Sequence, residues 1–163
     1  MISVQVSGHN IPVILARIKS ELLKDMSPLL DIIGEKVVLP SIAKNFKEEG
    51  RPNAWAPLKE RTQIERTKDG FDPEHPILQR YGELLEASTE KDGFGMMYDL
   101  EKQRLTIKNV LEKASRLHYG DPSSNLPARP FFFLQTEDYV KVEKETRKYL
   151  TKAIQKIVAT EAI

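Results

Sequence analysis

The chain has 163 residues, of which 40% are hydrophobic and 30% charged, and it contains no cysteine. The lack of cysteine excludes a disulfide framework, a cysteine-based metal site and a thiol nucleophile. With 25 Lys and Arg against 24 Asp and Glu, the formal net charge is +1, so no overall field recruits nucleic acid or an anionic membrane. A chain of this length buries roughly 70% of its unfolded surface in one core, so we expect a single domain over 1–163. We also expect no membrane span and no secretory signal, because the longest apolar run carries charged residues and no basic region precedes an apolar one near the N-terminus.

The first 49 residues are predicted to form a strand followed by two helices. Residues 2–7 alternate between apolar and polar side chains, which is the period of a half-buried strand. Apolar residues at spacings of three and four then predict an amphipathic helix over 11–26. A second helix is expected from about Pro28 to Glu48, in which Pro40 should cause a kink or a split.

A proline-rich loop excursion is predicted over 50–76, with about two helical turns at 58–67. It contains the only tryptophan, Trp55, between two prolines. Two interpretations of Trp55 are open. Its ring either pins the loop to the core, which is the more common role of a lone tryptophan in a loop, or contacts a partner molecule.

Three strand-like runs follow, at 84–89, 94–100 and 104–111. Asp92 and Gly93 separate the first two runs, and an Asp-Gly pair favours a hairpin turn because both turn positions require positive φ. The second and third runs alternate between apolar and polar residues. These features predict an antiparallel β-meander over 84–111 with one buried face.

The last part of the chain is predicted to form an aromatic loop over 121–134 and a helix over 136–160. Thr136 is placed to cap this helix, and acidic residues in its first turn suit the positive end of the helix dipole. We therefore expect an α+β fold in which an antiparallel β-meander packs against long amphipathic helices, mainly the second and the last.

No motif for catalysis or metal binding is found in the sequence. His9, His75 and His118 lie far apart, and none has a second histidine at ligand spacing. There is no nucleophile motif, phosphate-binding loop or metalloprotease motif. We expect no catalytic residue, no metal and no cofactor, and therefore no enzyme. The segment 136–161 carries six basic residues, but five acids in the same segment balance most of that charge, so nucleic acid binding is not favoured.

The segment Leu126–Leu134, with the sequence LPARPFFFL, is the most unusual part of the chain. Its two prolines favour an extended backbone, in which neighbouring side chains point to opposite sides. At least one of its three phenylalanines should therefore face outward or contact a partner. The alternative is that rings fill a gap in the core and that Arg129 braces its own loop. The candidate contact residues are Arg129, Pro130, Phe131, Phe132, Phe133 and Trp55.

The string Leu126–Phe131 and the acid-rich helix start behind it resemble the phage virion morphogenesis, or tail completion, family of Mu-like phages and prophages. Three further segments resemble that family in matching order. They are Phe46–Gly50 with Trp55–Leu58 and Thr62, then Ile77-Leu78 with Gly82, Leu84 and Ser88, and then Ala114–Gly120. The resemblance extends over about residues 46–150.

The resemblance implies a non-enzymatic structural protein that acts in tail completion or head-tail joining, as part of a ring or neck. It implies other phage tail or neck proteins as partners, homo-oligomers in the virion, and a location in the bacterial host cytoplasm during assembly and then in the virion. Two functions from other classes remain as alternatives. One is a nucleic-acid-binding accessory protein of a phage operon, and the other, less favoured, is a small carboxylate-dependent hydrolase.

Overall fold

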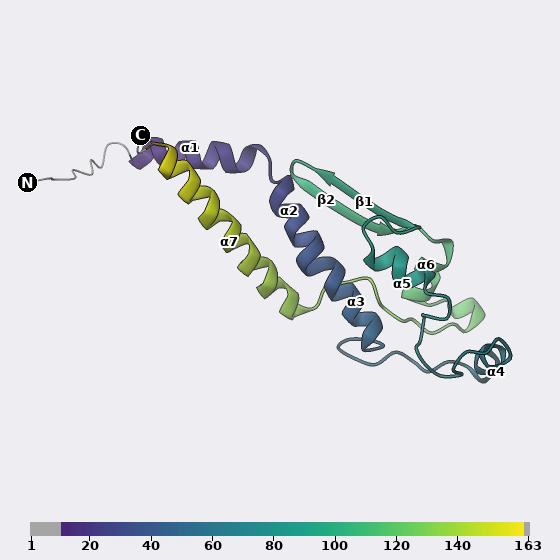
Figure 1. Ribbon diagram of the computed structural model, residues 1–163. Coiled ribbons are helices and arrows are strands. Elements are labelled where there is room, and N and C mark those ends of the chain that lie inside the picture. The colour runs from purple at the N-terminus through teal and green to yellow at the C-terminus, as the bar shows by residue number, and fades with distance from the viewer. Residues whose placement is uncertain (1–10, 162–163) are drawn as a thin grey trace, which may run out of the picture.

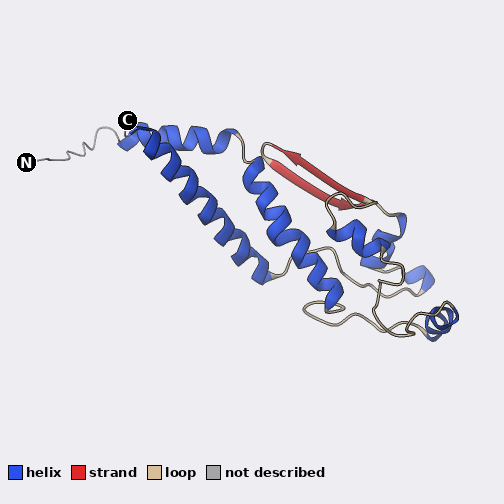
Figure 2. Ribbon diagram, in the orientation of Figure 1, coloured by secondary structure: helices blue, strands red, loops and turns tan. Residues whose placement is uncertain are grey.

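A computed structural model describes residues 11–161 of the chain, so the strand predicted over 2–7 lies outside the described residues. The described part is an α+β structure in which helices predominate and the sheet has two antiparallel strands, which confirms the predicted fold class (Figure 2). The helices of the N-terminal part are α1 (Ile11–Lys24), α2 (Ser27–Ile33), the π-helical turn η1 (Gly34–Val38) and α3 (Leu39–Lys47). The remaining elements are α4 (Glu60–Lys68), α5 (Glu83–Thr89), β1 (Met96–Glu101), β2 (Arg104–Asn109), α6 (Glu112–Tyr119), the 3-10 turn η2 (Pro122–Ser124) and α7 (Thr136–Glu161).

The molecule is elongated, with α2, η1 and α3 forming a central rod (Figure 1). Helix α7 runs along one side of this rod, and the β1–β2 hairpin lies on the other, with contacts from α2 to both. Helix α1 and the C-terminal part of α7 occupy one end of the molecule, while α4, α5 and α6 lie toward the opposite end (Figure 1). The predicted packing of the sheet against the second helix is therefore observed. Its predicted packing against the last helix is wrong, because α2 and α3 lie between the hairpin and α7 (Figure 1).

The central rod continues through Pro40, where a kink or split was expected. Pro40 has no backbone N–H, so an α-helix would leave the carbonyl four residues earlier without a donor. Directly before the proline, the chain instead widens into η1, in which the N–H of Leu39 reaches back five residues to the carbonyl of Gly34. A π-helical turn, rather than a break, accommodates the proline.

The predicted three-strand meander is wrong in its first strand, because 84–89 is helix α5. Gly82 precedes this helix in the left-handed conformation (φ 79°), which a glycine adopts without strain. Leu84, Ala87 and Ser88 are then buried together, at the three- and four-residue spacing of a helix. Residues 84–89 are too few for the spacing of their apolar side chains to distinguish a helix from a strand.

The hairpin turn predicted at Asp92 and Gly93 is also wrong, since these residues connect α5 to β1. The turn that joins the two strands is Lys102-Gln103, with Glu101 paired to Arg104. The strands themselves agree with the second and third predicted runs, and side chains of β1 alternate between half-buried and exposed as expected. Helix α6 was not predicted as a helix.

Helix α7 confirms the predicted C-terminal helix to within one residue. Its first turn is held by Asp138, whose carboxylate accepts the N–H of Gln135 (2.9 Å) while the Asp138 N–H donates to the carbonyl of Gln135 (2.9 Å). Among the described hydrogen bonds, Asp138 rather than Thr136 makes this capping contact.

The hairpin is attached to α2 by a small polar cluster around Tyr98. The Tyr98 hydroxyl donates to Asp31 Oδ1 (2.9 Å), and Lys91 donates to the same oxygen (2.7 Å) while its Nζ lies 4.5 Å from the Tyr98 ring centroid. Gly34 is buried beneath Tyr98, and a Cβ atom there would overlap the Tyr98 hydroxyl and lie 2.8 Å from Leu105 Cδ2. The close approach of hairpin and rod therefore requires a glycine.

Replacing Gly34 with Ala should lower the free energy of unfolding by about 1 to 3 kcal/mol, because the added methyl group overpacks this contact. An exposed helical glycine would give the opposite sign, since alanine favours a helix by about 1 kcal/mol. Urea denaturation measures the change. The double variant Gly34→Ala, Tyr98→Phe should lose less than the sum of the two single losses, because the overlapping hydroxyl is gone. Strictly additive losses, or a stabilised single variant, would contradict the packing argument.

Candidate functional site

The aromatic loop Leu126–Leu134 lies between η2 and α7, and Arg129 braces it from within. The Arg129 side chain is only 4% exposed, and it donates from Nε to the carbonyl of Ala56 (2.9 Å) and from Nη2 to the carbonyl of Pro57 (2.8 Å). Its own N–H donates to the carbonyl of Leu117 (3.0 Å). Arg129 therefore joins the aromatic loop to the proline-rich excursion and to α6. Burial lowers the pKa of its guanidinium from the ordinary value.

Trp55 anchors the excursion to the same loop. Its side chain is 7% exposed, and its indole N–H donates to the carbonyl of Pro130 (2.8 Å). The ring packs edge-on against Phe46, with centroids 5.8 Å apart. Of the two interpretations of Trp55, the structure shows the anchor.

Phe131 fills the centre of the core and is 1% exposed. Its ring centroid lies 5.2 Å from that of Phe46 and 5.2 Å from that of His118. The core cluster draws its members from α3, the excursion, the segment between the excursion and α5, α5 itself, α6 and the aromatic loop. They are Ile42, Phe46, Trp55, Ile77, Leu84, Ala114 and Phe131.

The loop backbone is clamped on both sides of Phe132. Asn45 Nδ2, which is buried on α3, donates to the carbonyl of Phe131 (2.8 Å) and to the carbonyl of Phe133 (3.1 Å). From the other side, His118 Nδ1 accepts the N–H groups of Phe131 and Phe132 (3.3 Å each). The position of the Phe132 ring is thus set by hydrogen bonds to the backbone on either side of it.

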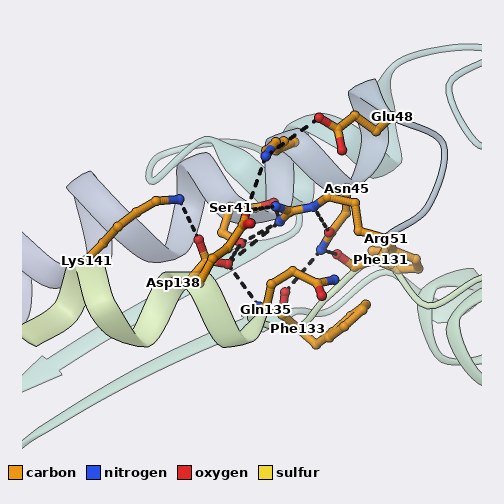
Figure 3. Close-up of polar contacts among 11 residues, drawn as sticks. Ser41, Asn45, Glu48, Arg51, Phe131, Phe133, Gln135, Asp138 and Lys141 are labelled. Carbon is orange, nitrogen blue, oxygen red and sulfur yellow. Dashed lines mark hydrogen bonds and ion pairs between the residues drawn. The ribbon is translucent and has the colours of Figure 1, made fainter. Parts of the chain in front are cut away.

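Arg51 holds Asn45 in place and connects it to α7 (Figure 3). Arg51 is buried, and its Nε donates to Asn45 Oδ1 (2.8 Å). Its Nη2 donates to the carbonyl and to the hydroxyl of Ser41 (2.8 Å each), and its Nη1 donates to Glu137 (2.8 Å). This polar network ties α3, the excursion, the aromatic loop and the first turn of α7 together.

Asp138 supplies the buried carboxylate of the network and is 0% exposed. It accepts hydrogen bonds from the Ser41 hydroxyl, from the N–H of Gln135 and from Lys141 Nζ (2.7 Å), and Arg51 Nη2 lies 3.8 Å away (Figure 3). Desolvation raises the pKa of Asp138, but these hydrogen bonds and the charge of Lys141 together outweigh it and leave the pKa below its ordinary value. The carboxylate is therefore ionised and paired at neutral pH.

Burial lowers the pKa of His118, so the imidazole is neutral and its Nδ1 is free to accept the two loop N–H groups. The unfolded chain binds the proton more readily, from its ordinary pKa of about 6.5 downward. The contribution of His118 to stability should therefore be fully present above pH 6.5 and decrease as the pH drops below it.

We expect the melting temperature of the wild type to decrease between pH 7.5 and 5.5. This decrease should be smaller in His118→Gln, because that variant has no imidazole at this position to protonate. Equal pH slopes in wild type and His118→Gln would contradict the assignment.

Phe132 forms a ridge between two open hollows on the surface, one with a mixed polar and apolar lining and one with an apolar lining. One hollow, of about 310 Å³, lies toward β2 and α6 and includes Ile107, His118 and Tyr119. The other, of about 270 Å³, lies toward α3 and is lined only by apolar side chains, including Ile107 and Phe133. Phe132 and Ile107 line both hollows, so the two adjoin each other, and together they are called the Phe132 surface.

The predicted site residues are brought together but divide into two groups. Arg129, Phe131 and Trp55 are buried and support the loop, whereas Pro130 is exposed and Phe132 and Phe133 are half-buried. The second group forms the solvent-accessible part of the loop. Sequence reasoning missed the polar network beneath it. Ser41 and Asn45 could have been noticed as polar residues on the inward face of a helix, beside Ile42 and Phe46.

Within residues 11–161, no group of three or more His, Asp or Glu side chains is arranged to hold a metal ion. In the same range, no helix is long and apolar enough to cross a membrane. Neither protein family models, nor curated proteins, nor solved structures gave a match to this chain.

Proposed function

We propose that this chain is a structural protein of phage or prophage virion assembly, which acts in tail completion or head-tail joining as part of a ring or neck. The observation that carries the proposal is the Phe132 ridge on its clamped loop. Because Asn45 and His118 already hold the backbone around this ring, little conformational entropy is lost when a partner docks there. Rigid aromatic side chains beside apolar hollows are typical of interface anchors.

A ring also requires two different patches on each copy, one fitting the other. The Phe132 surface is the first patch. The second is provided by α1 and the C-terminal part of α7, at one end of the molecule, where Leu15, Leu23 and Val158 are exposed (Figure 1). Two separate apolar areas on one elongated chain favour head-to-tail assembly. The proposed partners are further copies of this chain and other tail or neck proteins, in the bacterial host cytoplasm and then in the virion.

The charge arrangement of α7 supports an assembly role over nucleic acid binding. Half of its six basic side chains pair with carboxylates of the same helix, which leaves less positive charge for phosphate contacts. The pairs are Lys141 with Asp138, Arg147 with Glu143, and Lys148 with Glu145.

The test is to replace Phe132 with Ala in the phage or prophage that carries this chain, and to count infectious particles and free heads and tails after induction. Loss of an interface anchor should weaken the contact by about 2 kcal/mol, roughly thirtyfold in affinity, while the protein remains folded. Phe94→Ala is the matched control, because Phe94 is 81% exposed and lines neither hollow. Normal yields of joined particles from Phe132→Ala, or from a deletion of the whole gene, would refute the proposal.

A further inference from the structure

A separate cavity of about 270 Å³ lies between α4, the start of α5, α6 and the segment Leu126–Arg129. It is not part of the Phe132 surface and has no role in the proposed assembly contact. Five cationic side chains line it, against the single carboxylate of Glu83. The cations are Lys59, Arg66, Arg80, Lys113 and Arg129.

Among the described residues, two of these cations are buried without a direct salt bridge. Arg66 is 3% exposed and donates only to backbone carbonyls, those of Asp72 (2.6 Å), His75 (3.0 Å) and Pro76 (3.1 Å). Arg129 likewise donates only to carbonyls, and its Nη1 makes no hydrogen bond within residues 11–161. Hydrogen bonds from backbone N–H groups and then the charge of Arg66 lower the pKa of Asp72, and the Asp72 carboxylate offsets part of the charge of Arg66. Buried charges are normally paired, so Arg129, which has no acidic neighbour among the described residues, leaves positive charge in this wall.

The other cations add to this imbalance. Lys59 bonds only to the carbonyl of Asn125, and Arg80 has a buried Nε–H without a hydrogen-bond partner, although its Nη2 pairs with Asp69. Lys113 pairs with Glu83, the only acid of the lining. The cavity therefore offers free donors and excess positive charge to an anion.

The rest of the wall is apolar, which narrows the class of ligand. It consists mainly of Leu58, Leu78, Leu84, Leu117, Leu126 and Pro127. An inorganic phosphate would leave these side chains without a contact, whereas a carboxylate on a short aliphatic group meets both the cations and the leucines. The volume is at the low end of ligand sites, and suits a group of about the size of one leucine residue.

We propose that this cavity binds a carboxylate carried on a short aliphatic group, either a free aliphatic acid or the C-terminal apolar residue of a polypeptide. The cations fix the carboxylate, and the leucine wall encloses the aliphatic part. Because Arg129 also holds the aromatic loop, occupation of the cavity stabilises the folded chain around that loop.

The test is a calorimetric titration of the full chain with 4-methylpentanoate and with 4-methylpentanamide, which differ in charge but hardly in shape. The carboxylate should bind at least tenfold more tightly than the amide. It should also raise the melting temperature by about 3 to 6 °C at ten times its Kd. Equal affinity for acid and amide, no binding of the acid, or equal affinity for inorganic phosphate would overturn the proposal.

Variants locate the site without touching the buried arginines. Lys59→Gln and Lys113→Gln, at exposed positions of the rim, should each weaken binding of 4-methylpentanoate about threefold to tenfold, and Thr62→Phe should abolish it by filling the cavity. Lys152→Gln, an exposed lysine of α7 outside the cavity, is the control and should bind as the wild type does. Unchanged binding by both rim variants and by Thr62→Phe would place the ligand elsewhere and refute this site.

A second pair of probes separates the two sources of the ligand. Acetyl-Gly-Gly-Leu with a free carboxylate is compared with its C-terminal amide. If the ligand is the end of a polypeptide, the tripeptide with a free carboxylate should bind at least tenfold more tightly than 4-methylpentanoate. If the ligand is a small acid, 4-methylpentanoate should bind more tightly than the tripeptide. If none of the acids binds, the cavity proposal fails. The assembly proposal is unaffected by that result, because it depends on the Phe132 surface and is tested by particle counts.

Discussion

Replacing Phe131 with Ala should lower the free energy of unfolding by about 3 to 5 kcal/mol, because the ring is fully buried between Phe46 and His118 and its removal leaves a cavity. The neighbouring ring of Phe132 is half-buried, so Phe132→Ala should cost clearly less stability while weakening assembly more. Urea denaturation measures the first effect and particle counts measure the second.

The comparison decides between the two roles that an aromatic loop can have. Phe94→Ala again serves as the control, with an expected change within about 0.5 kcal/mol at its exposed position. If Phe131→Ala loses less than about 1 kcal/mol but abolishes assembly, the ring belongs to a partner contact rather than to the core. If Phe132→Ala and Phe133→Ala lose as much stability as Phe131→Ala with no separate assembly defect, the loop is purely structural.

Replacing Arg51 with Met should lower the free energy of unfolding by about 3 to 5 kcal/mol. The change removes donors from Asn45, Ser41 and Glu137 and takes a positive charge away from the buried Asp138 carboxylate. Arg51→Lys keeps the charge but loses the planar fork of donors, so it should lie between wild type and Arg51→Met.

A control for charge loss alone is Arg61→Met, because Arg61 forms only an exposed pair with Glu65 on α4. That variant should change stability by less than about 1 kcal/mol. The network also predicts coupling, so Asp138→Asn combined with Arg51→Met should cost less than the two single changes together. Losses that add, or an Arg51→Met variant as stable as Arg61→Met, would show that the network does not hold α7 to the rod.

Much of the helical structure could be predicted because its signals are local. The stripe of apolar residues in 136–160 repeats over many turns, and α7 ends within one residue of the prediction. Predictions for short segments were wrong because a local signal is ambiguous over only a few residues. Residues 84–89 are too few for a period to be distinctive, so the burial of Leu84, Ala87 and Ser88 by tertiary packing decided the helix. Asp92-Gly93 has strong turn chemistry, but a turn residue pair does not specify which elements it connects.

The sequence alone identified the α+β class, the long helices, two of the three strands proposed over 84–111, and the aromatic loop as the segment of interest. Only the tertiary structure decided which face each aromatic ring takes, and that Arg129 and Trp55 point inward. The physical reason is the distance along the chain between the groups that satisfy one another. Arg129 meets carbonyls 72 and 73 residues away, and Asn45 meets the loop 86 and 88 residues away. A buried donor must find an acceptor, but composition and spacing do not say which distant carbonyl the fold will bring to it.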